Sequence, residues 1–334
     1  MNDGNAEGGK KAAFAALAGR PSAGKSTLVN LLCGQPVAIV SSVPQTTRNA
    51  IRGIINRKEG QLVLVDTPGL HLSRREFNRR LAKTALRAAG EADIILYVLD
   101  ASRAPGPEEE AAALELAACA GSGSPEIPLV AAVNKMDHPQ ADFERTAAFL
   151  KGHFPSLDKS RILPVSALKN EGTERLLAAL YSAAPRGEPF YGEEYYTDQE
   201  IDFRISEIIR GEAIIRLRQE LPHALYVEVA DMEWRRTGGK KPSGQEPEAV
   251  DQRSAGEGGP GCRRLWVRAF IVCERESQKG IIVGRGGRGI KAIGEAARKK
   301  MNRIFDWKVE LDLRVKAGGD WRKNEGTLRK TLAF

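Results

Sequence analysis

The most constraining feature of this chain is the run GRPSAGKST at 19–27, which follows an apolar segment and leads into a helical pattern. Its spacing matches GxxxxGK[ST], the phosphate-binding loop between a strand and a helix. Glycines let successive backbone N–H groups face a polyphosphate, and the positive end of the following helix points at the same place. The run therefore predicts a nucleotide-binding α/β domain. The residues expected to contact phosphate are Gly19, Arg20, Pro21, Ser22, Ala23, Gly24, Lys25, Ser26 and Thr27.

Length and composition describe a globular protein of two domains. The chain has 334 residues, of which 42% are hydrophobic and 28% charged, and this length exceeds one ordinary core. Its four cysteines are scattered without CxxC or metal-ligand spacing, so we expect reduced thiols in a cytoplasmic protein and no metal other than Mg²⁺. The N-terminus has no signal-peptide pattern, and the longest apolar run, 94–99, is too short to cross a bilayer.

Positive charge is concentrated near the C-terminus. Residues 263–334 hold 19 Lys and Arg against 8 Asp and Glu, a net charge of +11, whereas the whole chain carries +8. The first 262 residues are therefore slightly acidic, at −3. This asymmetry predicts that the C-terminal part meets a polyanion, although a basic solvated surface would look the same.

Two patterns of secondary structure divide the chain. From 12 to 183, apolar strands alternate with helices, which predicts a mostly parallel sheet covered on both faces. The expected strands are 12–18, 51–56, 61–65, 94–99, 128–133 and 161–165, and the expected helices are 25–33, 77–89, 107–119, 141–152 and 172–182. From 201 to 334 the order is helix, strand, strand, helix, helix, strand, as in an α+β domain, and the first of these strands is expected at 225–230. Residues 1–11 are an expected flexible end, 184–200 an expected linker, and 237–261 an expected disordered insertion rich in Gly, Pro, Glu and Lys.

Asp66-Thr67-Pro68-Gly69 follows an apolar strand downstream of the phosphate-binding loop. The Asp66 carboxylate can reach Mg²⁺ through water and the Gly69 N–H can meet a γ-phosphate.

Asn134-Lys135-Met136-Asp137 ends a later strand. Its Asp137 carboxylate can accept hydrogen bonds from N1–H and the 2-amino group of guanine, a donor pair that adenine lacks. Asn134 would tie this loop to the phosphate-binding loop, and the Lys135 stem would lie against the base.

Two further loops complete the expected site. Ser166-Ala167 ends the last strand of the first domain, where the Ala167 N–H can donate to the guanine carbonyl. Gln45-Thr46-Thr47-Arg48 lies between the first helix and the second strand, where a threonine hydroxyl can complete a Mg²⁺ shell while a γ-phosphate is present. We expect Thr47 to be that ligand, with Thr46 as the second choice, beside Ser26 and Asp66. The loop 45–48 and Leu70 are the expected switch residues.

A glycine-rich loop lies between two helical patterns in the basic part. It has the spacing GxxG at 284–287, and it lets a single-stranded backbone approach closely. Residues Ile281, Ile282, Ile290 and Ile293 could line a groove for bases, and about half of them should instead be buried. The expected RNA contacts are Lys279, Gly280, Ile282, Gly284, Arg285, Gly286, Gly287, Arg288 and Lys291.

Together the five loops of the first part resemble the translation-factor-type GTPases, and the second part resembles a type II KH domain. A GTPase followed by one such domain resembles the Era family of bacterial ribosome-assembly GTPases. Further matching stretches are Leu221-Pro222-His223, Trp321-Arg322-Lys323-Asn324-Glu325 and Leu328-Arg329. The resemblance implies GTP and GDP as ligands, binding to 16S ribosomal RNA near its 3′ end, and maturation of the small ribosomal subunit. It also implies a cytoplasmic protein with some peripheral membrane contact; we expect a monomer.

Two positions bear on the hydrolysis rate. Leu70 stands where many signalling GTPases have a glutamine that orients water, so we expect slow intrinsic hydrolysis until a ribosomal partner completes the site. Members of the family usually carry Asn at the position of Ser22, an asparagine linked to stimulation by K⁺ in related GTPases. The resemblance therefore gives no basis for K⁺ stimulation here.

Other interpretations remain open at this point. The chain can be a P-loop ATPase with an RNA-binding tail, a module that holds GTP only as a structural ligand, or a nucleotide-dependent RNA-binding protein of another GTPase subfamily. The Asn134–Asp137 loop argues against ATP, and the expected Mg²⁺ ligands argue against a structural role. The single P-loop argues against relatives with tandem GTPase domains.

Overall fold

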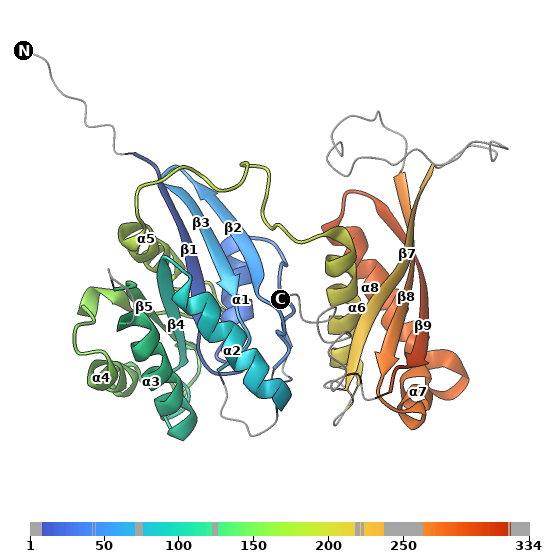
Figure 1. Ribbon diagram of the computed structural model, residues 1–334, viewed down its shortest axis with the longest axis horizontal. Helices are drawn as coiled ribbons and strands as arrows, with labels where there is room; N and C mark the ends of the chain where they lie inside the picture. Colours follow the sequence, from blue (N-terminus) through green and yellow to red (C-terminus); the bar gives the residue numbers. More distant parts are fainter. Residues whose placement is uncertain are drawn as a thin grey trace, which may run out of the picture. The chain divides into compact units, whose positions relative to one another are not determined.

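The computed structural model describes residues 9–41, 43, 45–70, 76–121, 126–217, 221, 224–236, 263–319 and 321. Residues 1–8 of the expected flexible end 1–11 lie outside these residues, as do the insertion 237–261 and the stretches 222–223 and 322–334. Lys11, expected to be flexible, is instead the first residue of a strand. The described chain forms two compact units that meet in sequence at Gln199 and Glu200 (Figure 1). Each unit is described by itself.

The first unit is built on a six-stranded sheet in the order β2-β3-β1-β4-β5-β6. Its strands are β1 (Lys11–Ala18), β2 (Ile51–Arg57), β3 (Gly60–Asp66), β4 (Ile94–Asp100), β5 (Leu129–Asn134) and β6 (Ile162–Pro164). All neighbouring pairs are parallel except β2 with β3. Every residue of β3, β4 and β5 is buried, as expected of parallel strands covered on both faces. The expected α/β fold is confirmed.

Helices cover both faces of this sheet (Figure 1). They are α1 (Lys25–Cys33), α2 (Glu76–Gly90), α3 (Pro107–Gly121), α4 (Phe143–His153) and α5 (Thr173–Ala183). One core cluster joins α2, α3 and α4 to the small and branched side chains of β1, β4 and β5. Because parallel strands end at the same sheet edge, the loops after β1, β3, β4, β5 and β6 gather there.

The segment 184–199, expected as a linker, runs beside the outer strands of this sheet. The Ile54 N–H donates to the Tyr196 carbonyl oxygen at 2.9 Å, and the Gln61 amide oxygen accepts the N–H groups of Phe190 and Tyr191. Arg52 pairs with Asp198 at 2.7 Å. These bonds attach the segment to β2 and β3, so it is part of the first unit rather than free chain.

The second unit has a three-stranded sheet in the order β7-β8-β9. Its elements are α6 (Ile201–Arg216), β7 (Leu225–Arg236), β8 (Arg263–Cys273), α7 (Glu276–Val283), a 3₁₀ turn η3 (Arg285–Gly287), α8 (Arg288–Ile304) and β9 (Lys308–Ala317). Strand β7 is antiparallel and β9 parallel to β8. The core cluster lies between α6, α7, α8 and the sheet. This is the expected order of elements.

Two boundaries differ from the sequence expectation. Strand β7 continues to Arg236 instead of ending at 230, because a bulge between Val229 and Asp231 restores the pairing beyond it. Strand β6 is only three residues long, since the 3₁₀ turn η1 (Lys159–Arg161) occupies its expected start. No helix among the described residues has the length and apolar character needed to span a membrane.

Candidate functional site

The loop after β1 has the geometry of a phosphate-binding loop. Gly24 caps α1 with φ 99°, and a Cβ there would lie 2.2 Å from the Asn134 Nδ2 atom, so only glycine fits. Lys25 curls back over the loop, where its Nζ donates to the carbonyl oxygens of Gly19 at 2.9 Å and Arg20 at 3.0 Å. Burial lowers the pKa of Lys25 to about 8, against the opposing pull of Asp66 and Glu109. Ser22 has φ 62°, a left-handed conformation uncommon for serine.

Three side chains expected to bind Mg²⁺ converge beside Lys25. Ser26 Oγ donates to Asp66 Oδ2 at 2.6 Å, and Thr47 Oγ1 lies 3.0 Å from Ser26 Oγ and 3.2 Å from Asp66 Oδ2. Asp66 is fully buried, and its Oδ1 has no hydrogen-bond partner among the described residues. Burial raises the pKa of this carboxyl, whereas Lys25 and the two hydroxyls lower it. A buried carboxylate oxygen without a partner beside two hydroxyls suits a hard divalent cation.

The other residues of the loop 45–48 make different contacts from Thr47. Thr46 Oγ1 donates to the Val43 carbonyl oxygen at 2.7 Å. Gln45 has a left-handed φ of 59°. Arg48 is buried, with its guanidinium carbon 5.9 Å from the centre of the Phe77 ring. The geometry therefore favours Thr47 over Thr46 as the ligand.

The loop after β3 packs directly on the phosphate-binding loop. Thr67 Oγ1 donates to the Leu17 carbonyl oxygen at 2.6 Å. Pro68 connects Thr67 to Gly69. A Cβ on Gly69 would lie 2.5 Å from the Pro21 nitrogen, so the loop after β3 and the phosphate-binding loop touch backbone to backbone. The Leu70 N–H donates to the Gly19 carbonyl oxygen at 3.0 Å, and its side chain is buried in the core cluster.

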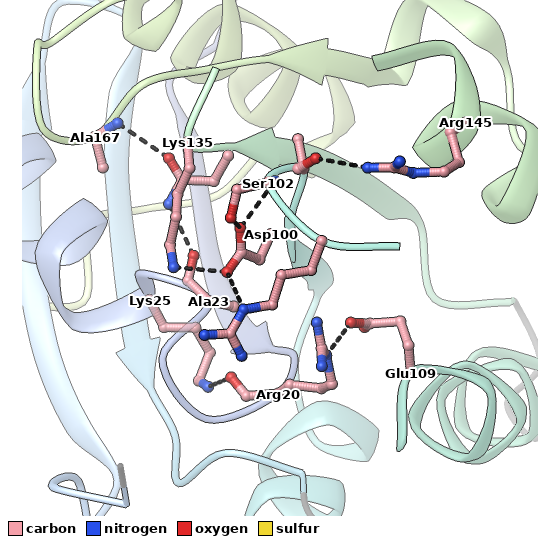
Figure 2. Close-up of polar contacts among 12 residues, drawn as sticks. Arg20, Ala23, Lys25, Asp100, Ser102, Glu109, Lys135, Arg145 and Ala167 are labelled. Atoms are coloured by element: carbon pink, nitrogen blue, oxygen red, sulfur yellow. Dashed lines mark hydrogen bonds and ion pairs between the residues drawn. The ribbon is translucent and has the colours of Figure 1, made fainter. Parts of the chain in front are cut away.

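Asn134 links the phosphate-binding loop to the expected guanine site. Its Nδ2 donates to the Ala23 carbonyl oxygen at 2.8 Å, and its Oδ1 accepts the Ala167 N–H at 3.0 Å (Figure 2). The tie to the phosphate-binding loop is the one expected from sequence. The Ala167 N–H, expected to donate to guanine, is here occupied by Asn134.

The other expected guanine ligands lie in the same place. Ser166 Oγ donates to Asp137 Oδ1 at 2.5 Å, and this bond lowers the pKa of the Asp137 carboxyl. Asp137 is therefore held as a carboxylate that accepts hydrogen bonds. Lys135 has φ 66° and extends to Asp100, with Nζ 2.6 Å from Oδ2 (Figure 2).

Two buried acids of this region were not predicted from the sequence. Asp100 ends β4 and also accepts bonds from the backbone and hydroxyl of Ser102; although burial acts to raise its pKa, the bonds from Lys135 and Ser102 lower it overall. Glu109, in the first turn of α3, accepts bonds from Arg20 and Tyr97. The position of Asp100 at a strand end, like that of Asp66, was the signal that could have found it. Glu109 sits in a run of three glutamates that gives no such signal.

In the second unit the GxxG loop is the turn between α7 and α8. Arg285, Gly286 and Arg288 are exposed, and Gly284, Gly286 and Gly287 have positive φ. Lys279, on α7, pairs with Glu276 at 3.2 Å, and Lys291 is exposed on the first turns of α8. Gly280 is exposed on α7.

One expected RNA contact needs correction. Ile282 has no exposed surface and belongs to the core of the second unit, as does Ile293. Its neighbour Ile281 is 61% exposed, because adjacent helix positions point about 100° apart. Half of the four isoleucines are buried, as expected, and Ile282 is one of those.

Comparisons with known proteins agree with this architecture. Residues 14–135 match the family model of the 50S ribosome-binding GTPase, and residues 247–322 match the KH domain model. The chain is 39% identical over 318 residues to the GTPase Era of Treponema denticola, covering 94% of this chain and 97% of the relative. It is 40% identical over 322 residues to that of Borreliella burgdorferi, covering 96% and 99%.

Solved structures agree as well. A crystal structure of Era in complex with MgGDPNP and nucleotides 1506–1542 of 16S ribosomal RNA aligns with a TM-score of 0.81 at 27% identity, covering 96% of this chain and 98% of that one. A single-residue variant of Aquifex aeolicus Era bound to GDP.AlF4⁻ aligns with a TM-score of 0.79 at 27% identity over the same shares. The convergent loops, the two domain matches and about 40% identity over nearly the whole length lead to one conclusion: this chain belongs to the Era family of GTPases.

Proposed function

We propose that this GTPase holds Mg²⁺ through Ser26, Thr47 and Asp66, hydrolyses GTP slowly by itself, and binds 16S ribosomal RNA near its 3′ end during maturation of the small subunit. The single observation that carries the proposal is that one chain joins the Ser26–Thr47–Asp66 cluster to a basic unit with an exposed GxxG loop. The relative solved with MgGDPNP and the 3′ region of 16S RNA supports both halves.

The metal assignment rests on the cluster itself. The hydroxyls of Ser26 and Thr47 face a buried carboxylate whose Oδ1 has no partner among the described residues. Bound there, Mg²⁺ would neutralise charge that develops on the phosphates. Thr47 belongs to a loop, so its contribution can depend on the nucleotide, whereas Ser26 and Asp66 stand at the ends of regular elements.

The protein groups supply position and charge rather than a covalent intermediate. In the overall reaction water attacks the γ-phosphorus, the bond to the β–γ bridging oxygen breaks, and GDP and phosphate leave. Lys25, held by Gly19 and Arg20, places a positive charge at the outer phosphates. The Gly69 N–H is our candidate donor to the γ-phosphate. Asp137 selects guanine, and Asn134 ties the guanine-binding loop to the phosphate-binding loop.

No side chain at position 70 can orient the attacking water. Leu70 is apolar and buried in the core cluster. This supports slow intrinsic hydrolysis that a partner accelerates. Phosphate release by the purified protein, alone and with small-subunit RNA, tests this. If the protein without RNA hydrolysed GTP at rates equal to those of activated GTPases, the proposal would be contradicted.

The proposed RNA site is the loop 284–287 with its neighbours. Gly284, Gly286 and Gly287 let a ribose-phosphate backbone approach, while Arg285 and Arg288 add charge at the exposed turn. Gly280, Lys279 and Lys291 flank it on the two helices. Because Ile282 is buried, we propose the exposed Ile281 in its place as the apolar side chain that contacts a base.

An RNA experiment tests this half. Full-length protein loaded with a GTP analogue is crosslinked to total RNA, and the bound fragments are sequenced. We expect the footprint at the 3′ end of 16S RNA. The double variant Arg285→Glu/Arg288→Glu should lose this footprint while its affinity for GDP stays unchanged. A footprint elsewhere would overturn the proposed target. The cytoplasmic location, with peripheral membrane contact, is supported by family membership alone.

RNA binding and the nucleotide state are proposed to be coupled. Gln199, the last residue of the first unit, donates through Nε2 to the Val37 carbonyl oxygen at 3.0 Å, and Asn30 holds the backbone of Val37 and Ala38. The loop with Thr47 follows that stretch in sequence. Equal RNA affinity of the GTP and GDP forms would dispose of the coupling.

A further inference from the structure

Glu109 is a buried carboxylate beside the phosphate-binding loop with no part in the proposed chemistry. It is 2% exposed and lies in the first turn of α3. Arg20 donates to it through Nε (Figure 2), and the Tyr97 hydroxyl donates to it at 2.5 Å from β4. Tyr97 itself has no exposed surface. The Arg20 guanidinium thus binds to α3, although it belongs to the loop that cradles phosphate.

Stability alone is a poor reason for such a pair. Removing two charges from water costs several kcal/mol per ion, and the attraction between them often only offsets that cost. Breaking one half of the pair, in contrast, leaves a largely buried charge without its oppositely charged partner. A buried charged pair in this place therefore serves better as a fixed attachment than as a source of folding energy.

The backbone of Arg20 stands where two functional loops meet. Its carbonyl oxygen accepts the Lys25 ammonium at 3.0 Å. The preceding residue, Gly19, accepts both Lys25 and the Leu70 N–H through its carbonyl oxygen. The following residue, Pro21, touches Gly69 so closely that a Cβ on Gly69 would lie 2.5 Å from its nitrogen.

We propose that Glu109 is a positioning residue that acts through Arg20 to hold Pro21 against Gly69, and so fixes the place of the γ-phosphate donor. The proposal rests on the role given above to the Gly69 N–H. A bound GDP needs the backbone N–H groups near Gly24 and Lys25, where the loop enters the helix. It has no γ-phosphate for the Gly69 N–H to meet. Loss of the attachment should therefore weaken GTP binding more than GDP binding.

The test compares Glu109→Gln with Glu110→Gln in the full chain. Gln keeps the size of the side chain and removes its charge, and Glu110 is the exposed neighbour on the same helix turn. Dissociation constants are measured for GDP and for a non-hydrolysable GTP analogue, with the melting temperature alongside. Because Glu109→Gln removes a charge-assisted hydrogen bond, we expect the ratio of analogue to GDP affinity to fall about tenfold or more in this variant. The ratio should stay unchanged in Glu110→Gln.

A fall in melting temperature with an unchanged affinity ratio would overturn the proposal, since Glu109 would then only stabilise the fold. Should Glu109→Gln fail to fold, Arg20→Gln carries the same test, because Arg20 is partly exposed. The double variant Arg20→Gln/Glu109→Gln should lower the ratio no further than either single change. Additive losses would show that the two side chains act separately and would also contradict the proposal.

Gly69→Ala separates this inference from its premise. The added methyl group would press on Pro21, so the GTP analogue should bind more weakly than GDP. An unchanged ratio in Gly69→Ala would remove the proposed role of Gly69, and the positioning role with it. A loss in Gly69→Ala without one in Glu109→Gln would remove only the positioning role.

Discussion

Asn134 and Ala23 are joined by a hydrogen bond of 2.8 Å, from the amide Nδ2 to the backbone carbonyl oxygen. The same side chain holds the Ala167 N–H through Oδ1. One buried amide thus spans the loops that are expected to meet phosphate and base. Nucleotide affinity should depend on this single residue even if it makes little contact with the ligand itself.

Replacing Asn134 by Ala should weaken GDP binding by about thirty- to a thousandfold, since two buried partners lose their bonds at about 1–2 kcal/mol each. Fluorescence titration with a labelled GDP measures this. Because Asn134 joins loops that GDP and the GTP analogue would both use, the affinities for the two nucleotides should fall together. A selective loss of the GTP analogue would contradict the structural role described here.

Asp137→Asn should change which base is accepted. The carboxylate accepts bonds only, and Ser166 keeps it ionised by lowering its pKa. An amide replaces one acceptor by a donor, which suits a base with a carbonyl where guanine has its 2-amino group. We expect the affinity for GDP to fall about a hundredfold, and the affinity for xanthosine diphosphate to rise, in competition titrations. A parallel loss for both nucleotides would show that Asp137 does not read this edge.

Thr47→Ala and Thr46→Ala form a matched pair for the metal site. Thr47 Oγ1 lies within hydrogen-bond distance of Ser26 and Asp66, whereas Thr46 Oγ1 bonds to the Val43 carbonyl oxygen. The Mg²⁺ concentration that supports half-maximal binding of a GTP analogue should rise about tenfold in Thr47→Ala, the loss of one ligand contact being about 1.4 kcal/mol. It should stay nearly constant in Thr46→Ala. The reverse result would exchange the two roles.

The regular elements of both units were predictable because their signals are local. Buried parallel strands such as β4 and β5 are apolar throughout, and four of the five motifs of the first unit follow the end of a strand, as in any open α/β sheet. Ser26, Thr47 and Asp66 could be placed together from spacing and order alone. The sequence also favours Thr47 over Thr46 as the expected Mg²⁺ ligand, and the hydrogen bonds of the two threonines support that choice.

Features that depend on tertiary contacts were not predictable. Which of three consecutive glutamates is buried depends on where Arg20 and Tyr97 lie. The hydrogen bond from the Ala167 N–H to Asn134 Oδ1 joins residues 33 positions apart, and no local pattern indicates it. The exchange of Ile282 for Ile281 follows from the rotation of α7, which a pattern with apolar residues at both positions does not fix.

Cys33 should react unusually slowly with thiol reagents. Burial raises its pKa from 9.0 to about 12, so the reactive thiolate at pH 8 is about a thousandfold scarcer than in an unperturbed thiol. Mass spectrometry of the Cys33 peptide after iodoacetamide treatment measures the rate in folded and denatured protein. The pKa of Cys33 is higher in the folded protein than in the unfolded chain. The contribution of this thiol to the free energy of unfolding is therefore fully present below about pH 9 and is lost as the pH rises toward 12. Equal labelling in both states at pH 8 would contradict the burial.

Leu70→Ala distinguishes packing from catalysis at the end of the loop after β3. The side chain is 2% exposed in the core cluster, so its truncation should lower the free energy of unfolding by about 2–5 kcal/mol, measured by urea denaturation. Leucine offers no group that can orient water, so phosphate release per folded molecule should remain slow. The affinity for GDP should also change little, because the contact of this residue with the phosphate-binding loop is made by its backbone N–H. A large drop in hydrolysis at unchanged stability would instead place the Leu70 side chain beside the reacting phosphate.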